Sequence, residues 1–226
     1  MLVFFSLMYE TFVYIDGFNF YYGALKSSGY KWLNPATLAE KMFPNKNIGR
    51  IKFFTAPVKF RPDNPSQVND QRTYWRALKT ISNLEIVEGK FYTSRVRMPR
   101  VPSGQLVEVE KSEEKGSDVN IAAHMLTDGF LKRYSTAILF SGDSDLVTPV
   151  QMVRDVLGLD VIVVNPQLKS SKNKRSSKML REAASMYRPD IKDSYLKDSQ
   201  FPDVFCDKHG RIEKPKSWPP PQKKRI

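Results

Sequence analysis

Two carboxylates and two hydroxyls lie within five consecutive residues, at positions 141–145. This turn directly follows the apolar run Thr136–Phe140, which predicts a buried strand, and it precedes an apolar-periodic segment that predicts a helix. Carboxylates as close as Asp143 and Asp145 repel one another unless a cation neutralises them, and their hard oxygen atoms favour Mg²⁺ or Mn²⁺ over softer metals. The turn therefore indicates a metal site, although a solvated helix-capping turn explains these residue types equally well.

Two further acids lie where predicted elements end or begin. Asp16 follows the β-branched and aromatic run at residues 11–15, and Asn19 lies in the same turn. Asp118 shares one face of a predicted helix with the apolar residues Ile121 and Met125, so we expect it on the core-facing side of the helix start. An acid in that position is costly unless it is paired or metal-bound. All these carboxylates meet at one edge of a sheet if the first strand lies beside the strand at 136–140.

Strands and helices alternate along the chain, which is typical of a doubly wound parallel sheet with right-handed crossovers. Strands are expected at residues 11–15, 51–55, 84–93, 136–140 and 160–164. Helices are expected at residues 20–26, 35–42, 70–80 and 178–187, and after N-caps at Ser117 and Thr148, with Asn34 as the cap of the second helix. The pattern predicts an α/β fold with a Rossmann-like, mostly parallel sheet. Such sheets bind ligands at the carboxyl ends of their strands.

Residues 95–110 depart from this alternation and predict a hairpin arm around the turn at 102–104. The approach to the arm and its first half carry Arg95 and Arg97 near Phe91 and Tyr92. Basic residues interleaved with aromatic ones suit contacts to the backbone and bases of single-stranded nucleic acid. An ordinary solvated hairpin is at least as good an interpretation.

The chain carries a formal net charge of +12, most of it near the carboxyl end. From residue 166 onward there are 16 Lys and Arg against 7 Asp and Glu. Lys172, Lys174 and Arg175 belong to a basic run that begins soon after the predicted strand at 160–164, so we expect them at the same edge as the acids. This distribution favours a neutralising partner such as nucleic acid, although many basic tails only add solubility.

The single cysteine, Cys206, excludes an internal disulfide framework and is typical of a reducing compartment, so we expect a cytoplasmic protein. The apolar opening at residues 1–8 is too short to span a bilayer and lacks the basic residues of a signal peptide, so no membrane association is expected. It is expected either to extend the first strand or to come from an upstream start codon, with Met8 as the natural start. One domain is expected over residues 9–200, followed by a basic, proline-rich tail at 201–226 that is extended or disordered from Trp218 on. No internal repeat and no glycine-rich nucleotide-binding loop is present, and the sequence leaves a homo-oligomer open.

Three motifs resemble those of the NYN domain family, a branch of the PIN-like nucleases. They are Tyr14-Ile-Asp16-Gly-Phe-Asn19, Glu114-Lys-Gly-Ser-Asp118-Val-Asn and Ser141-Gly-Asp143-Ser-Asp145-Leu, in the expected order within residues 10–200. The resemblance implies a Rossmann-like α/β domain whose acidic residues bind Mg²⁺ or Mn²⁺ and cleave RNA. Carried over position by position, it makes Asp16, Asp118, Asp143 and Asp145 the metal-binding and catalytic acids.

The resemblance also bears on the residues around these acids. Asn19 matches the accompanying polar residue of the first turn, Ser141 shapes the acidic turn, and Lys115 matches its motif without an assigned role. We expect Asn19, Lys115 and Ser141 to contact the substrate, together with the basic residues Lys172, Lys174, Arg175, Arg95 and Arg97. The hairpin arm and the proline-rich tail lie outside the three motifs, so the resemblance implies nothing about substrate choice.

The resemblance implies metal-dependent hydrolysis of RNA phosphodiester bonds, with single-stranded RNA as the expected substrate and an endonuclease as the expected mode. The four acids suit this chemistry. A metal ion neutralises phosphate oxygens and lowers the pKa of bound water, so no His or Lys base is needed. This suits a chain whose histidines, His124 and His209, are expected outside the acidic cluster, with His124 on the solvent face of its helix. A haloacid-dehalogenase-type phosphatase would need Asp in place of Phe18, and a Toprim-type domain would need Glu in place of Asp16. A non-catalytic RNA-binding or regulatory protein that keeps the fold is the alternative.

Overall fold

The computed structural model describes residues 10–171 and 176–218, and its centre is a six-stranded sheet in the order β3-β2-β1-β6-β7-β8. The strands are β1 (Glu10–Asp16), β2 (Asn47–Thr55), β3 (Leu84–Glu88), β6 (Thr136–Phe140), β7 (Asp160–Val164) and β8 (Met186–Arg188), and all neighbours pair in parallel. β1 lies beside β6, with Ile15 opposite Phe140. The sheet therefore extends from β1 in one direction and from β6 in the other. This confirms the doubly wound α/β fold and the strand order that the acidic motifs require.

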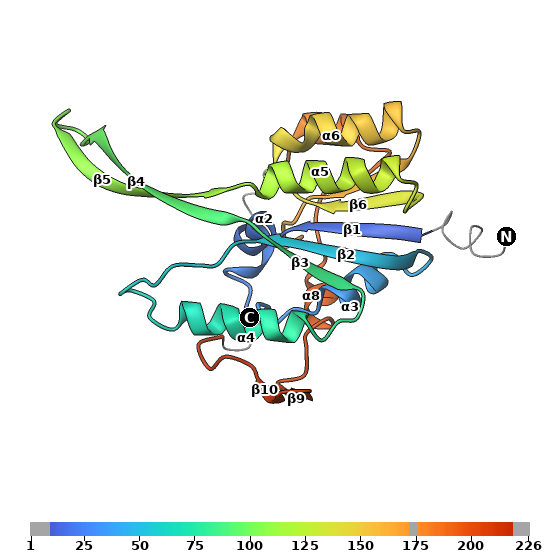
Figure 1. Ribbon diagram of the computed structural model, residues 1–226, viewed down its shortest axis with the longest axis horizontal. Helices are drawn as coiled ribbons and strands as arrows, with labels where there is room; N and C mark the ends of the chain where they lie inside the picture. The colour runs from blue at the N-terminus through green and yellow to red at the C-terminus, as the bar shows by residue number, and fades with distance from the viewer. Residues whose placement is uncertain (1–9, 172–175, 219–226) are drawn as a thin grey trace.

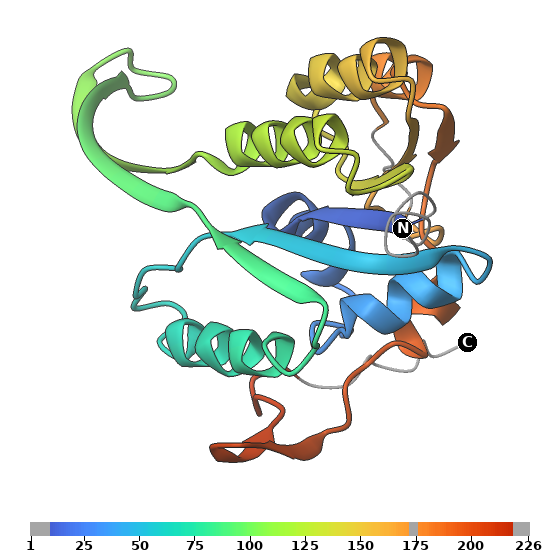
Figure 2. The same ribbon diagram turned by 45° about the vertical axis from the view of Figure 1, so that its right-hand side comes forward.

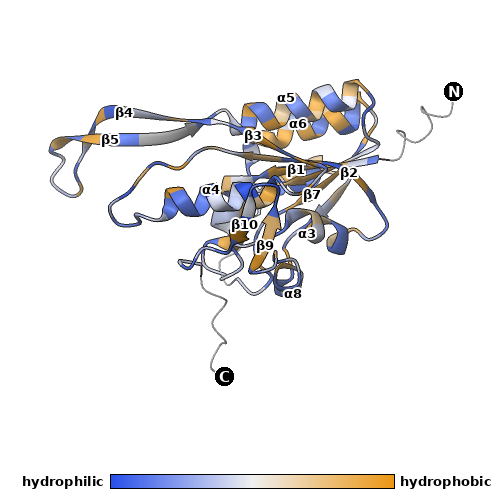
Figure 3. Ribbon diagram, turned by 60° about the horizontal axis from the view of Figure 1, so that its bottom comes forward, coloured by the Kyte–Doolittle hydropathy of each residue, from blue (hydrophilic) through white to orange (hydrophobic). Residues whose placement is uncertain are grey.

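Helices cover both faces of the sheet (Figure 1). One face carries α5 (Ser117–Phe130), α6 (Val147–Gln151) and α7 (Lys178–Ala183), and the other carries α3 (Pro35–Met42), α4 (Gln67–Leu78) and α8 (Asp193–Lys197). Because side chains alternate along a strand, Val13 and Ile15 enter one core while Phe12 and Tyr14 enter the other. Figure 3 shows the apolar residues concentrated on the central strands and on parts of the helices, as burial between layers requires.

The chain passes directly from β1 into a helical segment. α2 (Gly17–Phe20) and a π-helical turn, η1 (Tyr21–Leu25), follow without a break, so the helix begins three residues earlier than the sequence predicts. Asn34 caps α3 as expected, because its Oδ1 accepts a hydrogen bond from Ala36 N at 3.0 Å.

Two predicted caps are wrong. Gly116, not Ser117, is the N-cap of α5, and its φ of 102° is a left-handed conformation that glycine adopts at little cost. Ser117 is the first helical residue instead. Thr148 lies inside α6, because a 3₁₀ turn, η2 (Ser144–Leu146), already begins the helical segment and is capped by Asp143.

Two predicted elements are split in the structure. The strand expected at 84–93 breaks at Gly89, whose N–H donates to Thr55 O at 2.7 Å as the chain leaves the sheet. The helix expected at 178–187 ends at Ala183, because Ser185 N donates to Val161 O at 2.9 Å and brings β8 onto the edge of the sheet. At Ser185, backbone hydrogen bonding to the existing sheet outweighs the local helical pattern.

The expected hairpin is a long two-stranded arm that projects from the domain (Figures 1 and 2). It consists of β4 (Lys90–Pro99) and β5 (Leu106–Lys115), which pair antiparallel. Both strands are longer than the predicted hairpin because the pairing continues down to Lys90 and Lys115 at its base.

The carboxyl-terminal region also differs from the expectation up to residue 218. β9 (Val204–Asp207) and β10 (Gly210–Glu213) form a second hairpin. Trp218 packs against Trp32 and Tyr74, with ring centroids 6.1 and 5.6 Å apart, so an aromatic core holds this segment on the domain. Residues 219–226, and the start at residues 1–8, lie outside the described part of the chain. The domain boundary at residue 200 stays a prediction.

Within residues 10–171 and 176–218 we find no helix of the length and apolar character that crossing a membrane requires.

Candidate active site

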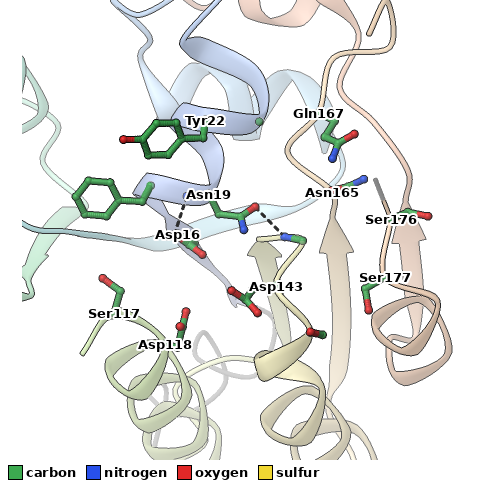
Figure 4. A pocket seen from close by; sticks show the side chains of 14 residues that line it. Asp16, Asn19, Tyr22, Ser117, Asp118, Asp143, Asn165, Gln167, Ser176 and Ser177 are labelled. Atoms are coloured by element: carbon green, nitrogen blue, oxygen red, sulfur yellow. Dashed lines mark hydrogen bonds between the residues drawn. The ribbon is translucent and has the colours of Figure 1, made fainter. Parts of the chain in front are cut away.

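A cavity of about 720 Å³ opens at the carboxyl ends of the central strands. Three of its lining residues are acids that come from separate parts of the chain. Asp16 ends β1, Asp118 is the second residue of α5, and Asp143 lies in the turn after β6. Figure 4 shows their side chains directed into the same hollow. The structure thus brings together three of the four acids that the sequence places at this edge.

Asp16 is held by hydrogen bonds from two directions. Its side chain is buried, with 5% of the residue exposed. Oδ1 accepts from Asn19 N at 3.0 Å, which caps α2, and Oδ2 accepts from the Ser141 hydroxyl at 3.0 Å. The carboxylate therefore has a defined orientation at the base of the cavity.

The acidic turn is folded around the same groups. The Ser141 hydroxyl accepts from Asp143 N at 3.1 Å, and Asn19 Oδ1 accepts from Gly142 N at 3.0 Å. Gly142 allows this close approach, because a Cβ there would stand 2.8 Å from Asn165 Oδ1. Asn19 and Ser141 thereby join the first turn to the acidic turn.

The acids repel one another, and the pKa of Asp16 reflects this. Burial raises its pKa most, hydrogen bonds from Asn19 and Ser141 oppose the rise, and the charges of Asp118 and Asp143 add to it, giving about 6. Among the described residues, no three His, Cys, Asp or Glu side chains converge tightly enough to hold an ion as they stand. The cavity presents a patch of hard oxygen donors that carries negative charge, which suits Mg²⁺ or Mn²⁺ chemically.

Other predicted site residues lie apart from this patch. Asp145 is exposed and is not among the residues that line the cavity, although its N–H donates to Asp143 Oδ1 at 3.0 Å. Lys115 is exposed at the end of β5 and is also absent from the lining. Ser141 is completely buried behind Asp16, where it orients the carboxylate.

The predicted basic residues divide into two groups. Arg95 and Arg97 are exposed on the projecting arm, where Arg95 Nε lies 3.8 Å from Glu110 Oε1 across the two strands. Lys172, Lys174 and Arg175 lie outside the described residues, so their expected position at the cavity edge stays a prediction.

The opposite wall of the cavity carries polar residues that the sequence analysis missed. They are Asn165, Gln167, Ser176 and Ser177. The aromatic residues Phe18 and Tyr22 also line the cavity. Asn165 directly follows β7, so the signal was available: it is a polar residue at the end of a buried strand, like Asp16. Ser177 could have been found as a helix cap, because its hydroxyl accepts from Leu180 N at 3.2 Å.

His124 is not the solvent-facing residue that the sequence predicts. Its Nδ1 lies 2.9 Å from Lys52 Nζ, and its ring packs edge-on against Phe54. Burial first, and then the charge of Lys52, lower the pKa of His124. Lys52 is itself buried and forms an ion pair with Asp128, whose Oδ2 also accepts from the Tyr14 hydroxyl at 2.8 Å. This ionic cluster connects α5 to the sheet and does not line the acidic cavity.

Comparisons with known proteins identify the family of the chain. The family model of the NYN domain matches residues 10–189. The chain is 29% identical over 237 aligned positions to 6-hydroxy-3-succinoylpyridine 3-monooxygenase HspA of Pseudomonas putida, covering 92% of this chain and 75% of that protein. A crystal structure of a protein of unknown function from Vibrio parahaemolyticus superposes with a TM-score of 0.51 at 17% identity, covering 80% of this chain and 92% of that one, which is a likeness of fold alone. Because the family match spans most of its length, the chain belongs to the NYN domain family of PIN-like nucleases.

Proposed function

We propose that this protein is a metal-dependent ribonuclease that hydrolyses RNA phosphodiester bonds in the acidic cavity. The observation that carries the proposal is the meeting of Asp16, Asp118 and Asp143, from three separate segments, around one hollow at the switch point of the sheet. Membership of a nuclease family supports the same reaction class. The basic character of the chain, with a net charge of +12, suits a polyanionic substrate.

Asp16, Asp118 and Asp143 are the residues that would hold Mg²⁺ or Mn²⁺. When bound, such an ion supplies charge neutralisation at the phosphate and an activated water. Asp16 is prepared for this role because Ser141 and the Asn19 backbone fix its orientation. Asp145 stays a weaker candidate, since it would have to reach the ion from outside the cavity lining.

The far wall of the cavity suits the substrate. Gln167 carries an amide and Ser176 a hydroxyl there, and both groups can donate hydrogen bonds to phosphate oxygens. A phosphodiester between this wall and the acids would have donors on one side and the metal-binding carboxylates on the other. The pocket is open enough for a strand to cross it, because it lies at the surface between η1, α5 and α7.

Cleavage of a labelled single-stranded RNA in Mg²⁺ or Mn²⁺ tests the proposal. Wild-type protein should cleave and should stop cleaving in EDTA, and Asp118→Asn should lower the rate by about 100-fold or more, since metal-directed contacts contribute several kcal/mol to the transition state. Asp63→Asn, an exposed acid in the loop before α4, is the matched control and should keep wild-type activity. A circular RNA distinguishes the expected endonuclease from an exonuclease. Tight RNA binding without metal-dependent cleavage would instead favour the non-catalytic alternative.

A second candidate is oxygenation of a small heteroaromatic acid. The observation that favours it is the 29% identity to a protein named as a monooxygenase of 6-hydroxy-3-succinoylpyridine, over 92% of this chain. Oxygen consumption with that compound and a reduced nicotinamide cofactor separates the two candidates. Oxygen uptake that depends on the compound, together with an inability to cleave RNA, would replace the nuclease proposal.

A further inference from the structure

A second cavity, of about 250 Å³, lies next to the acidic one. It is enclosed by α2 and η1, the carboxyl end of β2, the loop at 56–66, α4 and the segment that ends at Trp218. Phe18 and Tyr22 line both cavities, so their side chains form the boundary between the two. Whatever occupies the second cavity therefore lies directly beside the three acids.

Aromatic rings dominate the walls of this cavity. Beyond Phe18 and Tyr22 they are Tyr21, Phe53, Tyr74, Trp75 and Trp218. Trp75 is partly buried on α4, whereas Tyr22 is 63% exposed. Flat rings at several sides of a small cavity suit another flat ring, because offset and edge-on ring pairs add to the burial of apolar surface.

Hydrogen bonds hold these walls in place. Gln71 fixes the loop after β2 to α4, since its Oε1 accepts from Val58 N at 2.8 Å and its Nε2 donates to Ala56 O at 2.9 Å. Asp70 accepts from the Ser217 hydroxyl at 2.6 Å and so fixes the carboxyl-terminal segment beside Trp218. The cavity is thus a built feature of the fold and not a gap between loose loops.

The charges of the second cavity are opposite to those of the first. Lys26, Lys31 and Arg61 line it against one acid, Asp70. Lys26 Nζ lies 5.0 Å from the ring centroid of Tyr22, and Lys31 Nζ lies 5.9 Å from that of Tyr21, so both cations stand beside the aromatic walls. A ligand that fits is a planar ring that carries an anion.

We propose that the second cavity binds one nucleobase of the RNA strand, with the phosphate of that nucleotide toward Lys26 and Arg61. The adjoining phosphate then enters the acidic cavity past Phe18 and Tyr22. Base stacking on aromatic side chains together with phosphate contacts is how proteins bind single strands without a fixed sequence. The assignment of the ligand as an RNA strand rests on the proposed function, whereas the base-binding chemistry rests on the cavity itself.

Binding in EDTA tests this inference without any cleavage. The probes are a fluorescein-labelled single-stranded RNA hexamer and an abasic strand of the same length. Tyr22→Ala should weaken binding of the intact strand by roughly tenfold and leave the abasic strand unchanged, and Tyr22→Phe should keep wild-type affinity. Phe60→Ala is the matched control, because Phe60 is an aromatic residue that is 66% exposed, as Tyr22 is 63% exposed, and lies outside both cavities.

A second measurement places the base in the cavity. Binding of the intact strand should quench tryptophan emission. Replacing both Trp75 and Trp218 by Phe should remove most of the quench, since these two line the cavity and Trp32 is completely buried. Lys26→Ser with Arg61→Ser should weaken both strands and reduce the salt dependence.

Three results would overturn the inference. The first is an unchanged affinity of Tyr22→Ala for the intact strand, and the second is an equal loss of affinity for the intact and abasic strands. The third is displacement of the hexamer by uridine 5′-monophosphate at a concentration near the dissociation constant of the hexamer. The last result would assign the cavity to a free nucleotide. Failure of the proposed function is recognised separately: wild-type protein would show the Tyr22-dependent binding of RNA but cleave none with metal.

Discussion

The Ser141 hydroxyl donates a 3.0 Å hydrogen bond to Asp16 Oδ2 across 125 residues of chain. The same oxygen accepts from Asp143 N at 3.1 Å, so one buried side chain connects the turn after β1 to the turn after β6. The relative position of Asp16 and Asp143 therefore depends on Ser141.

Ser141→Ala should destabilise the protein by about 1–3 kcal/mol, because it leaves a buried carboxylate oxygen and a backbone N–H without their shared partner. Urea unfolding followed by circular dichroism measures this change. Ser144→Ala, in the same turn but exposed, is the control and should change the free energy of unfolding by less than about 0.5 kcal/mol. Equal effects of the two substitutions would contradict the linking role of Ser141.

Asp143→Asn and Asp145→Asn should differ in RNA cleavage. Asp143 lines the cavity with Asp16 and Asp118, so removing its charge should lower the rate by about 100-fold or more. Asp145 is exposed outside the lining, so its substitution should cost much less. Single-turnover cleavage of one labelled RNA compares the two proteins. An equal loss would return Asp145 to the metal site that the family resemblance implies.

The raised pKa of Asp16 predicts a pH-dependent stability in the absence of metal. Its folded-state pKa of about 6 lies above the ordinary 3.8, so the stabilising form is the protonated one, and its contribution is lost as the pH rises through 6. At pH 7.5 in EDTA, Asp16→Asn should therefore be more stable than wild type, by on the order of 3 kcal/mol. The difference should shrink at pH 5.

Metal should reverse this order. With Mg²⁺ at pH 7.5, wild type should gain stability because the ion binds only the folded state, and Asp16→Asn should gain less. Thermal unfolding across pH, with and without Mg²⁺, measures both effects. If Mg²⁺ does not stabilise the wild type, the metal site is contradicted. If Asp16→Asn is nevertheless the more stable protein in EDTA, the electrostatic argument for Asp16 still holds.

Asp128→Asn should damage the fold and not the chemistry. Burial alone would raise the pKa of Asp128, but hydrogen bonds from Lys52, Tyr14 and Arg133 lower it, so its contribution to stability is present above pH 4 and is lost as the pH falls. Neutralising it leaves Lys52 buried without its ion pair, which should cost about 3–5 kcal/mol. Cleavage per folded molecule, measured below the melting temperature, should stay at the wild-type value. A loss of activity in fully folded protein would show that this cluster acts on the site.

Changing Lys172, Lys174 and Arg175 to Ser should weaken RNA binding and raise KM while metal binding stays intact. Each lost phosphate contact should reduce the log–log salt slope of binding by about 0.7. A salt titration of the dissociation constant makes the comparison, with an Arg95→Ser, Arg97→Ser protein as the counterpart on the arm. An unchanged slope in the triple variant, with a reduced slope in the arm variant, would move the RNA path to the arm.

The sequence by itself determined the central architecture. Residues 11–15, 136–140 and 160–164 are runs of β-branched and other apolar residues, and each is a buried parallel strand in the structure. Local composition suffices there because strands buried on both faces require continuous apolar runs. Asp16 and Asp143 were identifiable for the same reason, since Asp16 directly follows one such run and Asp143 lies in the turn after another.

Only the tertiary structure decided which of these residues meet. Asp145 is two residues from Asp143 but is exposed and does not line the cavity, because it lies inside the 3₁₀ turn that Asp143 caps. His124 looked like a surface residue by helical period, yet Lys52 reaches it from β2, a strand far away in sequence. The second cavity likewise depends on Trp218, which looked like part of a tail and lies over Tyr74. These contacts join residues that are far apart in the sequence, so no local sequence pattern reveals them. Which side chains become neighbours between the sheet and the helices is therefore decided only when the whole chain folds.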